Sequence, residues 1–166
     1  MAKIKIVGLG GSLAPGSSSL AALKAALLAA EEAGATTELL DLAELDLPMY
    51  RPGSSSPNDA VRRLVDKPIG LISTAGGTQG LQAVNTMEYV VRALRGWAVP
   101  LVVPVPKAFE EFDAEGHARH PDIAGALAAL GAEVTRAAGL LAAERLTTQD
   151  AQQAEENLQP LSNPSS

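Results

Sequence analysis

The chain of 166 residues contains no cysteine. Disulfide bonds, thiolate catalysis and zinc–thiolate sites are therefore excluded. Aromatic residues make up only 3% of the chain, so the stacking platforms of single-stranded nucleic-acid binders are not expected. Basic residues are outnumbered by acidic ones, and the net charge of −6 argues against a nucleic-acid partner. We see no basic leader and no apolar run that approaches membrane-spanning length, which predicts a cytoplasmic protein without a membrane partner.

Apolar residues, in contrast, make up 46% of the chain, enough to bury the core of one domain. Continuous apolar runs alternate with helical patterns over residues 1–146, which is typical of a parallel sheet covered on both faces. The polar segment 147–166 is rich in Gln, Glu, Asn, Pro and Ser, and we expect a tail with a disordered end. The expected strands are 3–8, 36–42, 68–74 and 98–106, and the expected helices are 20–33, 58–65, 81–95 and 121–145.

A loop rich in Gly and Ser, residues 10–19, joins the first strand to the first helix. Glycine lets the backbone come close to a ligand, and the amides at a helix start lack helical partners and suit an anion. Gly11 and Gly16 have the spacing of a Walker loop, but Ser17 stands where lysine is required. The loop therefore predicts a phosphate site, although not one for nucleoside triphosphate hydrolysis.

Two other phosphate ligands fit this loop to different degrees. A dinucleotide site needs G-x-G-x-x-G, and Leu13 breaks that pattern, although Asp41 stands where its acidic residue is expected. The phosphate of flavin mononucleotide fits a hydroxyl-rich loop without lysine better. A glycine–serine turn without a ligand is the alternative interpretation.

A second glycine cluster, residues 73–80, follows the expected strand 68–74. Ligands of open α/β sheets bind beyond the carboxyl ends of the strands, near the point where the strand order reverses. Two Gly-rich loops that each follow a strand and precede a helix can therefore converge on one ligand. The first suits its phosphate, and the backbone amides of the second suit a planar polar ring.

Taken in order, these motifs resemble the NADPH-dependent FMN reductase family of flavodoxin-like flavin, quinone and azo reductases. The matching pieces are the Gly-Ser-Leu-Ala-Pro-Gly-Ser-Ser-Ser loop, the Asp-Leu-Pro-Met-Tyr turn at 46–50, the Lys-Pro-Ile-Gly-Leu run at 67–71, the Ala-Gly-Gly-Thr-Gln-Gly loop and the run 81–106. The resemblance implies a doubly wound parallel sheet of strand order 2-1-3-4-5. It also implies FMN as cofactor and NADPH as co-substrate.

The family pattern also assigns cofactor-binding residues. Those placed around the FMN phosphate are Ser12, Ala14, Ser17, Ser18 and Ser19. Those placed beside the isoalloxazine ring or ribityl chain are Ala75, Gly76, Gly77, Thr78 and Gln79. Many relatives carry Arg at the position of Ala14, so one phosphate-binding charge is lost here. We name no catalytic side chain and no metal ligand.

The sequence departs from the family in one larger respect, because the third strand and the helix after it are absent. Residues 62–66 pass directly into Lys67-Pro68, where relatives have a further strand, a flavin-packing loop and a helix. Three explanations account for this: the sequence omits an internal segment, a genuine deletion is closed by pairing the first strand with the family's fourth strand, which is 68–74 here, or a partner subunit supplies the strand. Omission is favoured because a central strand contributes many hydrogen bonds and much burial.

The remaining polar residues have plain interpretations. His117 and His120 lie three apart beside two acidic residues, but the segment reads as a solvated loop rather than a metal site. We expect Glu110 and Glu111 to form an exposed acidic edge and Asp41 to form a turn.

The helix expected over 81–95 carries two apolar stripes. Leu81, Val84, Met87, Val91 and Leu94 suit the core, whereas Tyr89, Val90, Ala93 and Trp97 lie near the opposite side. A helix that is apolar on two faces is buried on both, and relatives associate through such helices, so we expect a homodimer or homotetramer.

The resemblance implies an enzyme that passes hydride from NADPH to FMN and on to a flavin, quinone or similar small acceptor. The cofactor carries that chemistry while the protein supplies position and electrostatics. The alternative function is a flavodoxin-like electron carrier or assembly module without catalytic activity.

Overall fold

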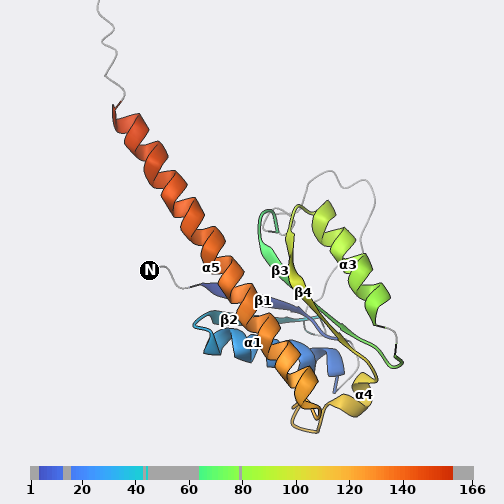
Figure 1. The fold of residues 1–166 in the computed structure, drawn as a ribbon. Coiled ribbons are helices and arrows are strands. Elements are labelled where there is room, and N and C mark those ends of the chain that lie inside the picture. Colours follow the sequence, from blue (N-terminus) through green and yellow to red (C-terminus); the bar gives the residue numbers. More distant parts are fainter. Residues whose placement is uncertain (1–3, 13–15, 43, 45–63, 79, 159–166) are drawn as a thin grey trace, which may run out of the picture.

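A computed structural model describes residues 4–12, 16–42, 44, 64–78 and 80–158. Its strands and helices alternate along the chain, as the apolar pattern predicts (Figure 1). The strands are β1 (Lys5–Gly10), β2 (Thr36–Asp41), β3 (Pro68–Thr74) and β4 (Trp97–Val105). The helices are α1 (Ser18–Glu32), α3 (Leu81–Ala93), α4 (Ala108–Glu111) and α5 (Pro121–Leu158).

Two expected helices differ from the structure. The helix expected over 58–65 lies mostly outside the described residues, and Leu64–Asp66 form a turn in which the Lys67 N–H donates to the Leu64 carbonyl at 3.2 Å. The last helix, expected to end near residue 145, continues to Leu158 and takes in the first part of the expected tail. The helix continues because residues 147–158 contain no Gly or Pro and are rich in good helix formers such as Gln, Glu and Ala. Residues 159–166 lie outside the described residues.

Both β–β pairings in the described chain are parallel. β1 pairs with β2 from Lys5↔Thr36 to Gly10↔Asp41, and β3 pairs with β4 from Pro68↔Trp97 to Thr74↔Val105. Parallel pairing requires a crossover connection, and α1 supplies it between β1 and β2 as α3 does between β3 and β4. These are the α/β units that the sequence predicts.

The described strands nevertheless do not form one continuous sheet. They form two sheets of two strands each, ordered β1-β2 and β3-β4. The explanation in which the first strand closes onto the strand at 68–74 is therefore wrong for the described residues. We use the term sheet split for the place where β1 and β3 do not pair with each other.

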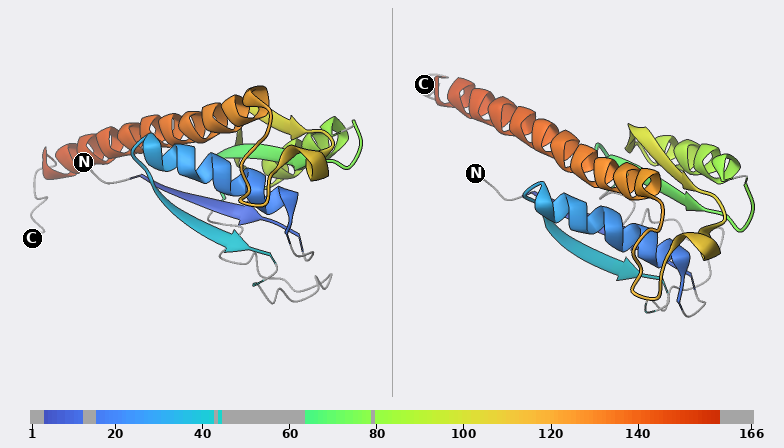
Figure 2. Two further views of the ribbon diagram at one scale, coloured as in Figure 1. Left: turned by 90° about the horizontal axis from the view of Figure 1, so that it is seen from below. Right: turned by 60° about the horizontal axis from the view of Figure 1, so that its bottom comes forward.

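One layer of helices holds both half-sheets. α1 packs on β1, β2 and β3, whereas α5 packs on β3 and β4, and the two helices pack on each other (Figure 2). Their backbones come so close that a Cβ added at Gly131 of α5 would lie 2.1 Å from the Ala26 carbonyl oxygen of α1. The core beneath this layer joins Ala22, Leu127 and Leu130 of the helices to Val103 and Val105 of β4.

The second helix layer, α3, packs on the opposite face of β3 and β4. Its Val84 and Val91 are buried against Leu71, as the core stripe predicts, although Leu81 is 57% exposed because it stands at the helix start. The second stripe is not buried within the single chain, since Tyr89 is 75% exposed. Trp97, which we expected to extend this stripe, begins β4 instead and is 60% exposed.

The apolar character of α5 exceeds what the sequence analysis expected. Its segment Pro121–Glu144 is long enough to cross a membrane and has a mean hydropathy of 1.4, so the statement that no run approaches that length is wrong. Only 22% of the most apolar window is buried in the structure, and such a helix by itself is weak evidence for a membrane span. Its Leu127 and Leu130 are nevertheless almost wholly inaccessible, because they pack against α1 and β4.

Candidate functional site

The first Gly-rich loop leaves β1 through a glycine that no other residue could easily replace. Gly11 has φ of +108°, which L side chains rarely adopt, and a Cβ there would lie 2.8 Å from Asp41 Oδ1. Asp41 ends β2 directly opposite Gly10, and its carbonyl accepts the Glu44 N–H at 3.1 Å, so it stands in a turn as expected. Its carboxylate puts a negative charge beside the loop.

The serines of this loop gather at the start of α1. Ser17 is the N-cap, and its hydroxyl accepts the Leu20 N–H at 3.3 Å, which leaves the hydroxyl proton available to a ligand. Ser18 and Ser19 form the first helical turn and are half-buried, where amides lack helical carbonyl partners and the helix dipole is positive. Ser12 is exposed, and Ala14 lies outside the described residues.

One hydrogen bond joins this loop to the second. Ser19 Oγ lies 2.6 Å from Thr74 Oγ1, and Thr74 is the last residue of β3. The second loop, which begins at Ala75, therefore starts beside the first turn of α1. The two loops therefore start at the same edge of the fold, and their convergence on one ligand stays a prediction.

Backbone hydrogen bonds from the segment after β4 brace the second loop. The Lys107 N–H donates to the Gly77 carbonyl at 2.9 Å, and the Ala108 N–H donates to the Ala75 carbonyl at 2.9 Å. Lys107 adopts a left-handed conformation, with φ of 45°, between β4 and α4. Two carbonyls of the loop are thus turned toward α4.

The other side of the second loop is open. Gly76, Gly77 and Thr78 are exposed, and a Cβ added at either glycine would meet nothing within 4 Å. Within the described part of the chain, no acceptor pairs with the backbone N–H groups of these three residues. Gln79 lies outside the described residues, as does the Pro48–Tyr50 turn.

The hydrogen-bond donors of these two loops match the groups of a phosphorylated planar ligand. The hydroxyls and the helix start on the first loop suit a phosphate monoester, and the exposed amides on the second suit the polar edge of a ring. The carboxylate of Asp41 does not contribute to such binding and sets one boundary of the phosphate end. The fit is therefore that of an FMN-type ligand bound mainly through hydroxyl and backbone groups.

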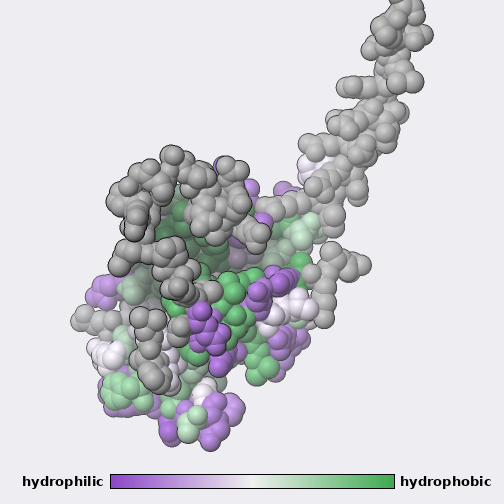
Figure 3. Space-filling view, turned by 180° about the vertical axis from the view of Figure 1, so that it is seen from behind, coloured by the Kyte–Doolittle hydropathy of each residue, from purple (hydrophilic) through white to green (hydrophobic). Residues whose placement is uncertain are grey.

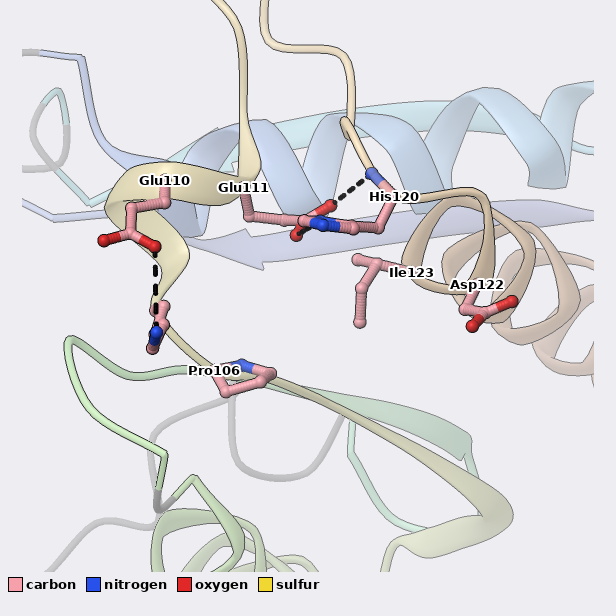
Figure 4. Close-up of a pocket in the computed structure, with 7 residues that line it drawn as sticks. Pro106, Glu110, Glu111, His120, Asp122 and Ile123 are labelled. Carbon is pink, nitrogen blue, oxygen red and sulfur yellow. Dashed lines mark hydrogen bonds and ion pairs between the residues drawn. The ribbon is translucent and has the colours of Figure 1, made fainter.

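A buried carboxylate lies on the far side of α4, and the sequence analysis missed it. Glu111, expected on an exposed edge with Glu110, is only 5% exposed, whereas Glu110 is exposed. Glu111 Oε1 accepts the His120 backbone N–H at 2.9 Å, and the His120 imidazole Nδ1 lies 2.6 Å from Glu111 Oε2 (Figure 4). The signal that could have found it is the i, i+3 spacing from Ala108, which places both residues on the buried side of α4.

Hydrogen bonding sets the charge state of Glu111. Burial raises the pKa of its carboxyl, but the hydrogen bonds from the backbone and imidazole of His120 outweigh burial and hold this pKa below its ordinary value of 4.5. Glu111 thereby links the end of α4 to the start of α5. An open cavity of about 300 Å³ adjoins the pair, and its lining residues are Pro106, Lys107, Glu110, Glu111, His120, Asp122 and Ile123.

The loop before α5 is closed on itself rather than arranged around a metal. The His117 backbone N–H donates to Asp113 Oδ1 at 2.7 Å, and this hydrogen bond holds the pKa of the Asp113 carboxyl below its ordinary value. A β-bridge between Phe112 and Ala118 closes the same turn. Among the described residues, no group of three or more His, Cys, Asp or Glu side chains could hold a metal ion.

Comparison with known proteins finds the family that the sequence motifs resemble. The profile of the NADPH-dependent FMN reductase family matches residues 4–66. The resemblance to that family is confirmed. The match ends two residues before β3 begins, at the junction where the sequence departs from the family pattern.

Three curated relatives share this resemblance, and each is named NADPH-dependent FMN reductase ArsH. The protein of Acidithiobacillus ferrooxidans is 42% identical over 57 residues, which cover 34% of this chain and 24% of the relative. That of Rhizobium meliloti is 34% identical over 86 residues, 52% of this chain and 33% of the relative. That of Shigella flexneri is 34% identical over 56 residues, 34% of this chain and 22% of the relative. The matched part therefore spans a third or less of the length of these relatives.

The flavodoxin-like α/β arrangement that the family implies is present, and the sheet split is where the structure departs from it.

Proposed function

We propose that this chain is an FMN-dependent NAD(P)H oxidoreductase that passes hydride from NADPH to FMN and on to a flavin, quinone or similar small acceptor. The observation that carries the proposal is the 2.6 Å hydrogen bond between Ser19 and Thr74, because it brings the two Gly-rich loops to one edge of the fold. The family match over residues 4–66, which contains the first loop, supports the same activity.

The roles of the binding residues follow from their donors. Ser12, Ser17, Ser18 and Ser19 would hold the phosphate of FMN, with Ser17 donating its hydroxyl proton and Ser18 and Ser19 offering first-turn amides. The backbone amides of Gly76, Gly77 and Thr78 would donate to the polar edge of the ring, while Ala75 is held in place by its hydrogen bond to Ala108. Ala14 and Gln79 stay predictions of the sequence alone. When bound, FMN supplies the hydride-accepting centre, so the chain needs no acid or nucleophile of its own.

A second candidate function is a flavodoxin-like electron carrier or assembly module without catalytic activity. The sheet split favours it, because the family places a third strand and a ring-packing loop between β1 and β3. Without them one side of the ring pocket would be open. The two functions differ in whether NADPH is consumed.

We also propose a homodimer or homotetramer in the cytoplasm, assembled through the outer stripe of α3. Tyr89 and Val90 of this stripe are large apolar residues that are 75% and 47% exposed, and Trp97, at the start of β4, is 60% exposed. Exposed apolar residues that lie together mark interaction surfaces.

The test is flavin binding followed by turnover. Purified protein titrated with FMN should show a shifted flavin absorbance spectrum, and with NADPH and a quinone it should consume NADPH. Ser17→Ala removes a hydrogen bond to a charged phosphate, worth about 1.5–3 kcal/mol, and should weaken FMN binding about 10-fold to 100-fold. Thr86→Ala is the control, because Thr86 lies on α3 and bonds only the Gln82 carbonyl within its own helix. Protein that binds FMN but consumes no NADPH would establish the electron carrier instead, and protein that binds no FMN would refute both functions.

A further inference from the structure

The second Gly-rich loop takes its conformation from hydrogen bonds to the start of α4. The carbonyls of Ala75 and Gly77 each accept a backbone N–H from residues 107–108, at 2.9 Å. In a trans peptide the C=O and the N–H point in opposite directions, and no peptide bond in the described chain is cis. The N–H groups that share these two peptide planes belong to Gly76 and Thr78. They therefore point away from α4, toward the open side of the loop.

Lys107 makes its hydrogen bond to Gly77 in a conformation that side chains disfavour. Its φ of 45° is left-handed, and for a residue with a Cβ this conformation is disfavoured by about 5-fold to 30-fold. A residue keeps such a conformation only when the structure on both sides fixes it. On the N-terminal side β4 supplies this restraint, because its last residue, Val105, is wholly buried. The restraint on the other side must come from α4.

α4 itself is held at few points. Of its four residues only Ala108 and Glu111 are buried, whereas Phe109 is 67% exposed and Glu110 is exposed. Hydrophilic side chains lie at the lower end of the face seen in Figure 3, which is the end where Figure 1 places α4. Phe112, directly after the helix, packs on the core, but apolar packing is not directional. The directional restraint at the end of α4 therefore comes from Glu111.

The Glu111 carboxylate ties this end of α4 to the start of α5. One oxygen, Oε1, accepts the His120 backbone N–H at 2.9 Å, and the other lies 2.6 Å from the imidazole Nδ1. The Arg119 N–H adds a hydrogen bond to the Glu111 carbonyl at 2.7 Å. The helix that follows is firmly placed, because its Leu127 and Leu130 are almost inaccessible in the core. Glu111 thus joins a short, exposed helix to a fixed one.

We propose that Glu111 is a positioning residue for the flavin ring. By tying α4 to α5, Glu111 keeps Lys107 left-handed, which holds the peptide plane between Gly77 and Thr78 and aims its N–H at the ring. Without Glu111, Lys107 relaxes to a negative φ, its N–H leaves the Gly77 carbonyl and this peptide plane can rotate. The role at the ring rests on the proposed function, whereas the control of Lys107 by Glu111 does not. The Glu111 carboxylate is occupied by His120 and acts only through α4.

The experiment compares variants of the full chain by two measurements. Amide exchange without FMN reports on residues 107–108, and titration with FMN reports the dissociation constant and the shift of the flavin absorbance. Glu111→Ala should make both amides exchange about 10-fold faster and weaken FMN binding about 10-fold, because the left-handed conformation of Lys107 is no longer enforced. Glu111→Gln, which can still accept the His120 N–H, should weaken FMN binding less than Glu111→Ala does.

Two further substitutions separate positioning from stability. Glycine adopts the left-handed conformation without strain, so Lys107→Gly added to Glu111→Ala should restore the FMN affinity to within about 3-fold of the original. Val99→Ala is the matched control, because Val99 is buried in the core about 20 Å along β4 from Val105. Loss of this buried side chain should lower the melting temperature, as Glu111→Ala does, and leave the FMN affinity and the absorbance shift unchanged.

Four results would overturn the proposal. The first is exchange of the amides of residues 107–108 that is no faster in Glu111→Ala than in Val99→Ala. The second is Glu111→Ala protein that binds FMN as tightly as the original. The third is an equal loss of affinity in Val99→Ala, and the fourth is no recovery on adding Lys107→Gly, because either would make the effect one of general stability. If the original protein binds no FMN, the proposed function fails and the role at the ring fails with it, while the exchange measurement still decides whether Glu111 controls Lys107.

Discussion

Replacing Gly131 by alanine should destabilise the protein through the contact between α1 and α5. An added Cβ would lie 2.1 Å from the Ala26 carbonyl oxygen, a separation that real Cβ atoms essentially never show. Ordinary contact begins near 3.4 Å, so the two helices must separate by about 1.3 Å. A displacement of that size removes a large part of the dispersion attraction between Ala22 and its partners Leu127 and Leu130.

The magnitude follows from two opposing effects. Alanine favours the helix over glycine by about 1 kcal/mol, whereas forcing extra atoms into a well-packed core costs about 1–3 kcal/mol and occasionally more. Because the clashing atom, the Ala26 carbonyl oxygen, belongs to the backbone, we expect a cost in the upper part of that range. The free energy of unfolding should therefore fall by about 2 kcal/mol in total. For a chain of this size the loss lowers Tm by about 4–8 °C.

Gly139 provides the matched control on the same helix. A Cβ there meets nothing within 4 Å, so Gly139→Ala should gain about 0.4–1 kcal/mol from the helix preference alone. Thermal and urea unfolding of both variants should therefore shift in opposite directions. Equal shifts, or a Gly131→Ala variant as stable as the original protein, would show that the close approach of α1 and α5 does not constrain the fold.

Three further predictions concern the linked loops and the exposed stripe. Glu111→Gln should lower the free energy of unfolding by about 1–3 kcal/mol at pH 7. The pKa of Glu111 in the folded protein lies below its ordinary value, so the stabilisation by its carboxylate is present above about pH 4.5 and is lost as the pH falls through the folded pKa. The unfolding curves of the variant and the original protein should therefore converge in acid. A double-mutant cycle of Ser19→Ala and Thr74→Val should give a coupling of about 0.5–1.5 kcal/mol in urea unfolding, and additive effects would contradict the shared hydrogen bond. Tyr89→Lys should reduce the sedimentation coefficient if the outer stripe of α3 joins subunits, and an unchanged coefficient together with a monomeric original would refute that interface.

The fold could be predicted from the sequence where local pattern and tertiary packing agree. The apolar runs at β1–β4 and the helical patterns of α1 and α3 place these elements within a few residues of their observed bounds. The start of both Gly-rich loops at one edge of the fold also followed from the rule that parallel strands end at one edge. The end of α5 was misplaced, because polar composition was taken as a sign of disorder although Gln, Glu and Ala favour a helix.

The parts that could not be predicted depend on three-dimensional context. The burial of Glu111 arises because α4 turns it toward the start of α5, where the His120 backbone and imidazole satisfy the carboxylate. The sequence shows two adjacent glutamates and does not distinguish them. The absence of the third strand was visible in the motif order, but whether β1 would then pair with β3 depended on the positions of α1 and α5.

The length of α5 has a practical consequence for attaching this protein to a surface. The helix begins at Pro121 beside the candidate site and leaves the body at the opposite end (Figure 1). Its 38 residues span about 57 Å, and the part after Glu144 accounts for about 20 Å of that length. An electrode or bead linked to the C-terminus through this helix would therefore be held away from the two Gly-rich loops. Both loops would then face the solution, and small electron donors and acceptors would reach them as freely as in the unattached protein.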